Sequence, residues 1–318
     1  MSAAAALSQD ILSQALEAAK GAALEAGALL KEFYELRYNH DEAIATGTAT
    51  EESRKSFEAA ALGAAAKTAD TDLVTEYDKR CDALITDRLV AFQKKLGEGA
   101  PAFSFITEEL APEGPLTDAP TWIVDPIDGT MSFVHKSFDC CISIGLAVGK
   151  VPVLGVIYCP FLGRDGELYT AVRGGGAFMN GKQIHVTLCR KPVKAVVFFN
   201  MPWRMAPRAI NSSVGIRTEL ASDRVRAIRS YGAAVLQLAQ VACGRGDLYM
   251  EPGGKMWDVC AGAIVVEEAG GVVRNLDGSP FTLETHNIIA SSSNELADYG
   301  AALCTKYKLL QEYFAPDE

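Results

Sequence analysis

Six short apolar runs, each bounded by turn-forming residues, follow one another between residues 103 and 179. Short runs of this kind, separated by Gly, Pro, Asn and Asp, are typical of β-strands. The predicted strands are Phe103–Thr107, Trp122–Asp125, Cys140–Val148, Val153–Cys159, Glu167–Val172 and Gly176–Met179. A block of consecutive strands indicates a sheet. Because a sheet must bury at least one face, the chain is limited to folds in which other layers cover it.

The second half of the chain alternates between strand and helix patterns. Strands are predicted near Val196–Asn200, Val225–Ser230, Leu248–Glu251, Val272–Arg274 and Ile288–Ser291. The helices predicted between and after them lie near Ala233–Cys243, Asp258–Ala269 and Asn294–Leu310. A block of strands followed by this alternation indicates layered sheets and helices rather than a barrel or a bundle.

Two amphipathic helices are predicted before the block of strands. Between Ser8 and about Arg37, apolar residues recur near the helical period, and Ser8 is a suitable N-cap. The second predicted helix spans Thr75–Leu96, where Asp78 follows Thr75 at capping-box spacing. Residues 38–66 lose the periodicity and are rich in Ala, Thr and Glu. We therefore predict a surface insertion there, either a loop or a loosely packed helix.

Charge and cysteine usage exclude several classes of protein. The formal net charge of −10 and the pI near 5.0 argue against a nucleic-acid partner, because nucleic-acid affinity comes largely from Lys and Arg. The eight cysteines form no CxxC pair, which favours reduced, buried thiols over a zinc site. The N-terminus has no signal-peptide pattern and no apolar run is long enough to span a membrane, so we expect a cytoplasmic protein with no membrane partner.

Acidic residues stand at the ends of two predicted strands. Glu108 and Glu109 follow the first strand, while Asp125 and Asp128 end the next one. Carboxylates grouped in this way repel one another and raise their own pKa values unless a cation is present. Oxygen-only ligands suit Mg²⁺, which completes its shell with water and substrate phosphate. The pattern therefore favours a magnesium site beside a phosphate.

The turn after Asp125 also offers backbone groups to a phosphate. Gly129 permits close approach, and the N–H groups around Gly129 and Thr130 would hold phosphate oxygens if a helical turn begins there. The alternative is an ordinary surface turn, because Pro, Asp and Gly are common turn residues.

Two separated segments resemble the two signatures of the inositol monophosphatase family. The first is Trp122-Ile-Val-Asp-Pro-Ile-Asp-Gly-Thr130, and the second is Trp257-Asp-Val-Cys-Ala-Gly262 followed by Glu268-Ala-Gly-Gly271. Further similarity extends the resemblance over about residues 67 to 292. It implies an α/β fold with alternating α-β-α-β-α layers, as in sugar phosphatases. It also implies one domain over residues 1–318, with the active site between approximate halves 1–190 and 191–318.

The resemblance also implies a set of metal ligands. They are the side chains of Glu108, Asp125, Asp128 and Asp258 and the backbone carbonyl of Ile127. Two or three Mg²⁺ ions are implied. A metal-activated water would then attack phosphorus, with no covalent phospho-enzyme.

Three residues resemble the family's water-orienting group: Glu108, Thr130 and Asp78, with Thr130 relaying a hydrogen bond towards Asp78. The family pattern further implies contacts with the substrate. The positions concerned are Asp128, Gly129, Thr130, Gly232, Ala233, Ala234, Glu251 and Asp258.

The activity that the resemblance implies is Mg²⁺-dependent, lithium-sensitive hydrolysis of myo-inositol monophosphate by a homodimer. Two alternatives stay open. One is a phosphatase of another small ester, such as fructose 1,6-bisphosphate or 3′-phosphoadenosine 5′-phosphate, and the other is an inactive metal-binding protein. The sequence departs from the family pattern at Ser132, where Asn is frequent, at the insertion before residue 67, and at Pro252–Met256. None of these departures removes a predicted metal ligand, so they bear on specificity.

Overall fold

A computed structural model describes residues 7–52, 55, 65–66, 73–202 and 206–315. The helices are α1 (Gln9–Ala45), α3 (Glu76–Lys95), α4 (Thr130–Val134), α5 (Pro207–Ser222), α6 (Ala234–Ala242), α7 (Met256–Glu268), α8 (Asn294–Lys306) and α9 (Leu309–Phe314). Two 3₁₀ turns, η1 (Pro192–Lys194) and η2 (Leu283–Thr285), lie in loops. In the described part of the chain, no helix is both long enough and apolar enough to span a bilayer.

The first half of the chain forms a seven-stranded sheet in the order β3-β4-β5-β6-β7-β8-β9. Its strands are β3 (Ser104–Thr107), β4 (Thr121–Asp128), β5 (Cys141–Val148), β6 (Val151–Cys159), β7 (Glu167–Val172), β8 (Gly176–Met179) and β9 (Lys182–Gln183). β3 and β4 run parallel, and the other neighbours run antiparallel. A short antiparallel pair, β1 (Ala65–Ala66) with β2 (Leu73–Val74), precedes this sheet in the sequence.

The second half forms a five-stranded sheet in the order β11-β10-β12-β14-β13. Its strands are β10 (Val196–Phe199), β11 (Ala227–Arg229), β12 (Leu248–Pro252), β13 (Val272–Arg274) and β14 (Asn287–Ser291). β10 pairs in parallel with β11 and β12, whereas β14 runs antiparallel to β12 and β13. The sheet is therefore mixed.

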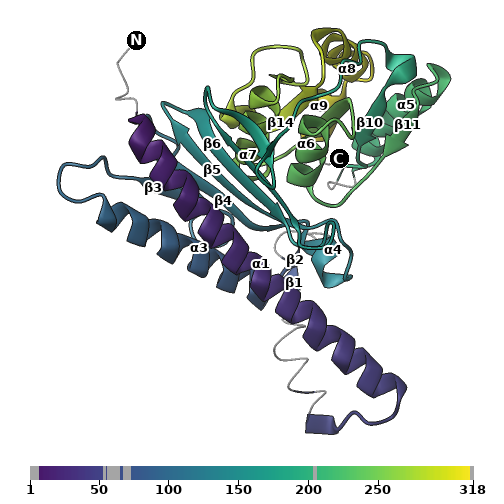
Figure 1. The fold of residues 1–318 in the computed structure, drawn as a ribbon. Helices are drawn as coiled ribbons and strands as arrows, with labels where there is room; N and C mark the ends of the chain where they lie inside the picture. Colours follow the sequence, from purple (N-terminus) through teal and green to yellow (C-terminus); the bar gives the residue numbers. More distant parts are fainter. Residues whose placement is uncertain (1–6, 53–54, 56–64, 67–72, 203–205, 316–318) are drawn as a thin grey trace.

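The two sheets and their helices stack in five layers (Figure 1). Helices α1 and α3 cover one face of the seven-stranded sheet, and α6 and α7 lie between the two sheets. Helices α5, α8 and α9 cover the outer face of the five-stranded sheet. Three hydrophobic cores join the layers: one lies beneath α1 and α3, one surrounds α6 and α7 and reaches both sheets, and one lies beneath the outer helices of the five-stranded sheet. This order confirms the predicted α-β-α-β-α layers.

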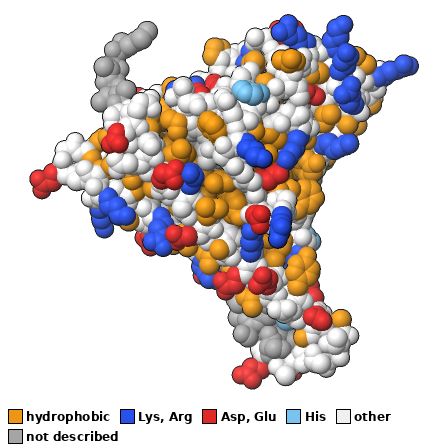
Figure 2. Space-filling view, viewed as in Figure 1, with side chains coloured by type: hydrophobic (Ala, Val, Ile, Leu, Met, Phe, Trp, Pro, Cys, Tyr) orange, Lys and Arg blue, Asp and Glu red, His pale blue; other side chains and the backbone are white. Residues whose placement is uncertain are grey.

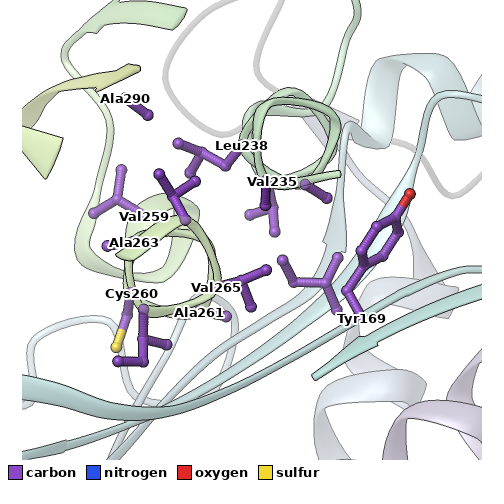
Figure 3. Packing of buried hydrophobic residues seen from close by; sticks show 14 of the residues in the cluster. Tyr169, Val235, Leu238, Val259, Cys260, Ala261, Ala263, Val265 and Ala290 are labelled. Carbon is purple, nitrogen blue, oxygen red and sulfur yellow. The ribbon is translucent and has the colours of Figure 1, made fainter. Parts of the chain in front are cut away.

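The central layer depends on small residues. Figure 3 shows Val235 and Leu238 of α6 beside α7, with Tyr169 of β7 at the edge of the same core. Helix α7 lies close to the seven-stranded sheet because glycines face it. A Cβ at Gly155 would lie 2.5 Å from the Ala261 carbonyl oxygen, and one at Gly145 would lie 2.5 Å from Cys260 Sγ. These glycines set the height of α7 above the sheet.

The structure differs from the sequence prediction in three elements. Helix α1 continues to Ala45 instead of ending near Arg37, because its last turns are held by tertiary contacts: Arg37 donates to the Val134 carbonyl at 3.1 Å, and Lys136 pairs with Asp41. The rest of the predicted insertion, 46–66, lies mostly outside the described residues. Helix α5 has no counterpart in the prediction. The predicted helix Asn294–Leu310 divides into α8 and α9, because Lys308 takes a left-handed conformation at φ 51°.

The cysteines agree with the prediction of reduced thiols. All eight are free, and Cys81, Cys140, Cys141, Cys159, Cys260 and Cys304 are buried. Burial raises the pKa of the Cys81 thiol to about 12. A buried thiol of this kind behaves as a small hydrophobic side chain.

Replacing Gly155 by Ala tests the spacing of the central layer. The added methyl group meets the backbone of α7, so we expect Gly155→Ala to lower the free energy of unfolding by about 1–3 kcal/mol. Urea denaturation followed by circular dichroism measures the change. Gly21→Ala, in helix α1 where a new Cβ has no neighbour within 4 Å, is the control and should be neutral or stabilising. Equal stability of the two variants would contradict the packing argument.

Candidate active site

Three aspartates converge between the layers. Asp125 and Asp128 lie at the end of β4, and Asp258 lies in the first turn of α7. One carboxylate oxygen from each lies within 4.8 Å of the other two. Asp125 and Asp128 are buried, and Asp258 is half-buried. The structure therefore brings together three of the predicted metal ligands from distant parts of the sequence.

An irregularity in β4 places both of its aspartates on one face. Asp125 pairs with Ser143 and Asp128 with Cys141, so three steps along β4 oppose two steps along β5. In a regular strand, residues three apart point to opposite faces, but one extra residue restores them to the same face. Pro126, which has no N–H to offer the ladder, lies within this bulge. The Ile127 N–H donates to Asp125 Oδ1 at 3.0 Å and holds that carboxylate in place.

Asp128 is anchored on the start of helix α6. Its carboxylate accepts from the N–H groups of Ala234 at 3.2 Å and Val235 at 2.6 Å. The first N–H groups of a helix have no partner within the helix, and the helix dipole favours a negative charge there. Asp128 thereby joins β4 to the helix between the sheets.

Two hydrogen bonds fix the position of Asp258 at the start of α7, one to its side chain and one to the residue before it. Its Oδ2 accepts from the Lys255 N–H at 2.7 Å, which caps the start of α7. Ser143, the cross-strand partner of Asp125, donates its hydroxyl to the Trp257 carbonyl at 3.0 Å. The contact brings the start of α7 to the strand next to β4. Asp125 and Asp258 also share a side-chain hydrogen bond.

The three carboxylates of the cluster repel one another when they are ionised, and a bound cation would offset this repulsion. Desolvation, and then the charge of Glu108, raises the pKa of Asp258 from its ordinary value of 3.8 to about 7. Desolvation also raises the pKa values of Asp125 and Asp128 well above this ordinary value, and the neighbouring carboxylates raise them further. Carboxylate oxygens so placed suit a hard divalent cation such as Mg²⁺, whose charge removes the repulsion. The donor set therefore fits the metal that the family resemblance implies.

Glu108 and Ile127 adjoin the three aspartates. Glu108 follows β3, and its charge and hydrogen bond raise the pKa of Asp125. The Ile127 carbonyl lies 3.1 Å from the Thr130 hydroxyl. The remaining acidic residue of the strand-end pair, Glu109, donates its backbone N–H to Asp82 at 3.1 Å.

The half-buried Thr130 and the buried Asp78 form a pair next to the cluster. The Thr130 hydroxyl lies 3.1 Å from Asp78 Oδ1 and 3.1 Å from the Ile127 carbonyl, and it donates to one of them at a time. Asp78 Oδ2 closes the predicted capping box by accepting the Thr75 N–H at 2.7 Å. Desolvation raises the pKa of Asp78 to about 6, although its hydrogen bonds with Thr75 oppose the shift.

The turn at Gly129 requires glycine. Its φ of 86° is left-handed, and a Cβ there would lie 2.8 Å from the Asp139 carbonyl oxygen. Helix α4 begins at the next residue, as the phosphate-binding interpretation of this turn requires, although its single turn is short.

A cavity of 410 Å³ opens beside the cluster and is lined by Asp128, Asp258 and Glu251 together with Gly232 and Ala234. Glu251, at the end of β12, accepts from the Tyr249 hydroxyl at 3.2 Å, and desolvation raises its pKa to about 8. Ala233 is fully buried and does not line the cavity. The N–H groups of Gly232 and Ala234 already donate to Asp139 and Asp128.

The sequence analysis overlooked several residues of this site. Asp139 is buried and accepts from the Gly232 N–H at 2.6 Å and from the Ser137 hydroxyl. A single aspartate in a loop carries no pattern that would reveal this role. Asn200 and Arg217 also line the cavity. Asn200 ends a predicted strand and is polar, which was a usable signal, whereas Arg217 lies in the unpredicted α5.

Stability against pH tests the cation argument. Native Asp258 keeps its proton up to about pH 7, while the unfolded carboxyl releases it near 3.8. The stability due to this raised pKa is complete below about pH 4 and is lost as the pH rises to about 7 in protein without metal. Mg²⁺ binds the charged carboxylates, so its stabilising effect should grow across the same window.

The measurement is the thermal unfolding midpoint at about pH 5 and about pH 8, with chelator and with Mg²⁺. We expect the shift caused by Mg²⁺ to be larger at the higher pH. Sodium chloride of matched ionic strength is the control, because salt also screens repulsion. Equal shifts at both pH values would contradict a cation at this cluster.

Comparison with known proteins agrees with the site. The chain matches the sequence model of the inositol monophosphatase family over residues 12–309. Inositol monophosphatase 2 of Solanum lycopersicum is 42% identical over 228 residues, which are 70% of this chain and 82% of that protein. Inositol monophosphatase 1 of Homo sapiens is 36% identical over 235 residues, which are 73% of this chain and 81% of that protein.

Solved structures share the fold. The extragenic suppressor protein suhB from Bartonella henselae has a TM-score of 0.73 and 27% identity, covering 91% of this chain and 98% of its own. An inositol monophosphatase from Anabaena has a TM-score of 0.71 and 28% identity, covering 93% and 96%. With the layered fold and the acidic site, these similarities show that the chain is a phosphomonoesterase and belongs to the inositol monophosphatase family.

Proposed function

We propose that this phosphatase hydrolyses myo-inositol monophosphate to inositol and phosphate with Mg²⁺. The observation that carries the proposal is the group of Asp125, Asp128 and Asp258 within 4.8 Å, of which Asp128 and Asp258 line a cavity of 410 Å³. The cavity volume suits a small polar ester. The names of the curated relatives support inositol monophosphate as that ester.

The proposed metal ligands are those of the sequence analysis: Glu108, Asp125, Asp128, Asp258 and the Ile127 carbonyl, holding two or three ions. When bound, Mg²⁺ lowers the pKa of a coordinated water and stabilises negative charge on the phosphoryl and leaving oxygens. The protein fixes the carboxylates through the β4 bulge and the starts of α6 and α7. We also propose that residues 1–318 act as one domain, with the site between approximate halves 1–190 and 191–318.

Thr130 and Asp78 are the proposed water-orienting pair, with Glu108 beside them. At about pH 7 most of Asp78 is ionised, because its pKa is about 6. Its Oδ1 then accepts a hydrogen bond from the Thr130 hydroxyl, which leaves the hydroxyl oxygen free to accept a hydrogen bond from the attacking water and so to orient it. The water oxygen forms the new bond to phosphorus as the ester P–O bond breaks; one proton of the water stays on the phosphate and the other ends on the leaving alcohol.

Substrate contacts are proposed at the starts of two helices. Gly129 and Thr130, at the start of α4, are proposed to face the phosphate. At the start of α6, Gly232 and Ala234 line the cavity, whereas Ala233, predicted with them, is buried. Glu251 is proposed to form a hydrogen bond with a hydroxyl of the substrate ring. With a pKa of about 8, it is mostly protonated at about pH 7 and so offers both a donor and an acceptor.

We further propose a homodimer. Hydrophobic side chains gather across the middle of the face drawn in Figure 2, with charged side chains around them. Patches with this arrangement often mark interfaces between proteins. Sedimentation at micromolar concentration should therefore show a dimer, and a monomer throughout would contradict it.

Asp125→Asn tests the metal assignment. The amide keeps the size of the carboxylate but loses its charge, so we expect phosphate release to fall by at least about a thousandfold while the fold is retained. The assay is phosphate release with Mg²⁺, and circular dichroism checks the fold. Asp165→Asn, on the exposed loop between β6 and β7, is the matched control and should keep full activity. Near-normal turnover by Asp125→Asn would exclude this aspartate as a ligand.

The same assay decides the substrate. Inositol 1-phosphate, fructose 1,6-bisphosphate and 3′-phosphoadenosine 5′-phosphate are compared, each with and without lithium. We expect preference for the inositol ester and inhibition by lithium. Preference for another ester would keep the metal site and change the substrate, whereas no release from any ester would favour a metal-binding protein without turnover.

A further inference from the structure

The cavity beside the aspartates has a polar wall that the proposed mechanism does not use. Asn200 follows β10, Arg217 lies in α5, and Ser230 follows β11. All three line the same cavity as Asp128, Asp258 and Glu251. They belong to the five-stranded sheet and its outer helix, whereas Asp125 and Asp128 come from the seven-stranded sheet.

Asn200 has an unsatisfied acceptor in this wall. Its Nδ2 donates to Glu251 Oε2 at 3.5 Å, which orients the amide. Its Oδ1 is buried and accepts no hydrogen bond from the described residues. A buried acceptor without a partner costs about 1–3 kcal/mol, and Asn200 lines the cavity, so a substrate hydroxyl that reaches this atom would remove that cost.

Arg217 has an unsatisfied donor in the same wall. Its Nη2 donates to the Ser230 hydroxyl at 2.7 Å and to the Phe199 carbonyl, and its guanidinium lies 5.8 Å from the centre of the Phe199 ring. Its Nε is buried and donates to no described residue. Within the described ranges, Arg217 forms no ion pair with a carboxylate. The existing contacts fix the guanidinium and leave one N–H for a ligand.

The two unsatisfied groups require opposite partners. An ionised phosphate oxygen accepts but has no hydrogen to offer Asn200 Oδ1, and an apolar group satisfies neither atom. A hydroxyl both donates and accepts, so neighbouring hydroxyls of a polyol satisfy both atoms. Glu251, which contacts Asn200, is already proposed to read a ring hydroxyl, so the new wall continues the same recognition surface.

We propose that Asn200 and Arg217 form a hydroxyl-recognition wall that selects phosphate esters of polyols. The proposal rests on the proposed function, because it assumes that the ester phosphate binds at the aspartates. Asn200 Oδ1 accepts from one substrate hydroxyl, and Arg217 donates from Nε to the same hydroxyl or to its neighbour. Ser230 holds Arg217 in position and does not contact the substrate.

Asn200→Ala tests the wall with two esters. Inositol 1-phosphate carries the hydroxyls, whereas p-nitrophenyl phosphate has none. We expect kcat/KM to fall about tenfold for the inositol ester and to change less than about twofold for the nitrophenyl ester. Arg217→Met, which keeps the length of the side chain but has no donor, should show the same selective loss. Asn211→Ala, on the exposed face of α5, is the control and should leave both esters unchanged.

Inositol phosphates that each lack one hydroxyl complete the test. One of them should be a poor substrate for the wild type yet be hydrolysed by Asn200→Ala as well as the full ester is. Equal losses of kcat/KM with both esters would show that Asn200 supports the metal site instead. Unchanged kcat/KM with both esters would show that water, and not a substrate hydroxyl, satisfies Asn200 Oδ1. Either result overturns the proposal. A wild-type enzyme that does not prefer the inositol ester would instead refute the proposed substrate.

Discussion

Repulsion among three carboxylates is the constraint on which the rest of this structure depends. Asp125, Asp128 and Asp258 lie within 4.8 Å of one another in a place with little water, where like charges interact strongly. The fold keeps them there by local devices: a bulge in β4, the N–H groups of α6, and the capped start of α7. Each device holds one carboxylate, and none neutralises all three. Protonation relieves the repulsion at low pH, and the proposed cation would relieve it near neutral pH, where the carboxylates are charged.

The packing of α7 couples this site to the stability of both sheets. Asp258 depends on the height of α7, and that height depends on Gly145 and Gly155 in the neighbouring strands. The same helix fills the core between the sheets. Because interiors are close-packed, a small displacement of α7 would reach the carboxylates as well as the core. Stability and metal binding are therefore expected to change together when this layer is altered.

Local sequence patterns predicted the parts of the site that depend on neighbours in the chain. The Thr75–Asp78 capping box formed as expected, and most strands lie within a few residues of their predicted positions. What the patterns left out depends on contacts between distant residues. The last turns of α1 are held by the segment after α4, and Asp139 meets Gly232 across the site. Neither contact can be recognised from the periodicity or the composition of the sequence.

One departure from the family pattern, Ser132, lies beside the site. Ser132, where Asn is frequent, is short, and a Cβ on Gly232 would lie only 2.1 Å from its hydroxyl oxygen, so the two segments are in close contact. The Gly232 N–H is satisfied by Asp139. Asp128 is held separately, by the N–H groups of Ala234 and Val235 in α6. Most of the proposed metal ligands thus belong to the seven-stranded sheet or follow its strands, while the proposed hydroxyl wall belongs to the five-stranded sheet and its outer helix. Substitutions in the second sheet can therefore change which alcohol is recognised while the chemistry at phosphorus is preserved.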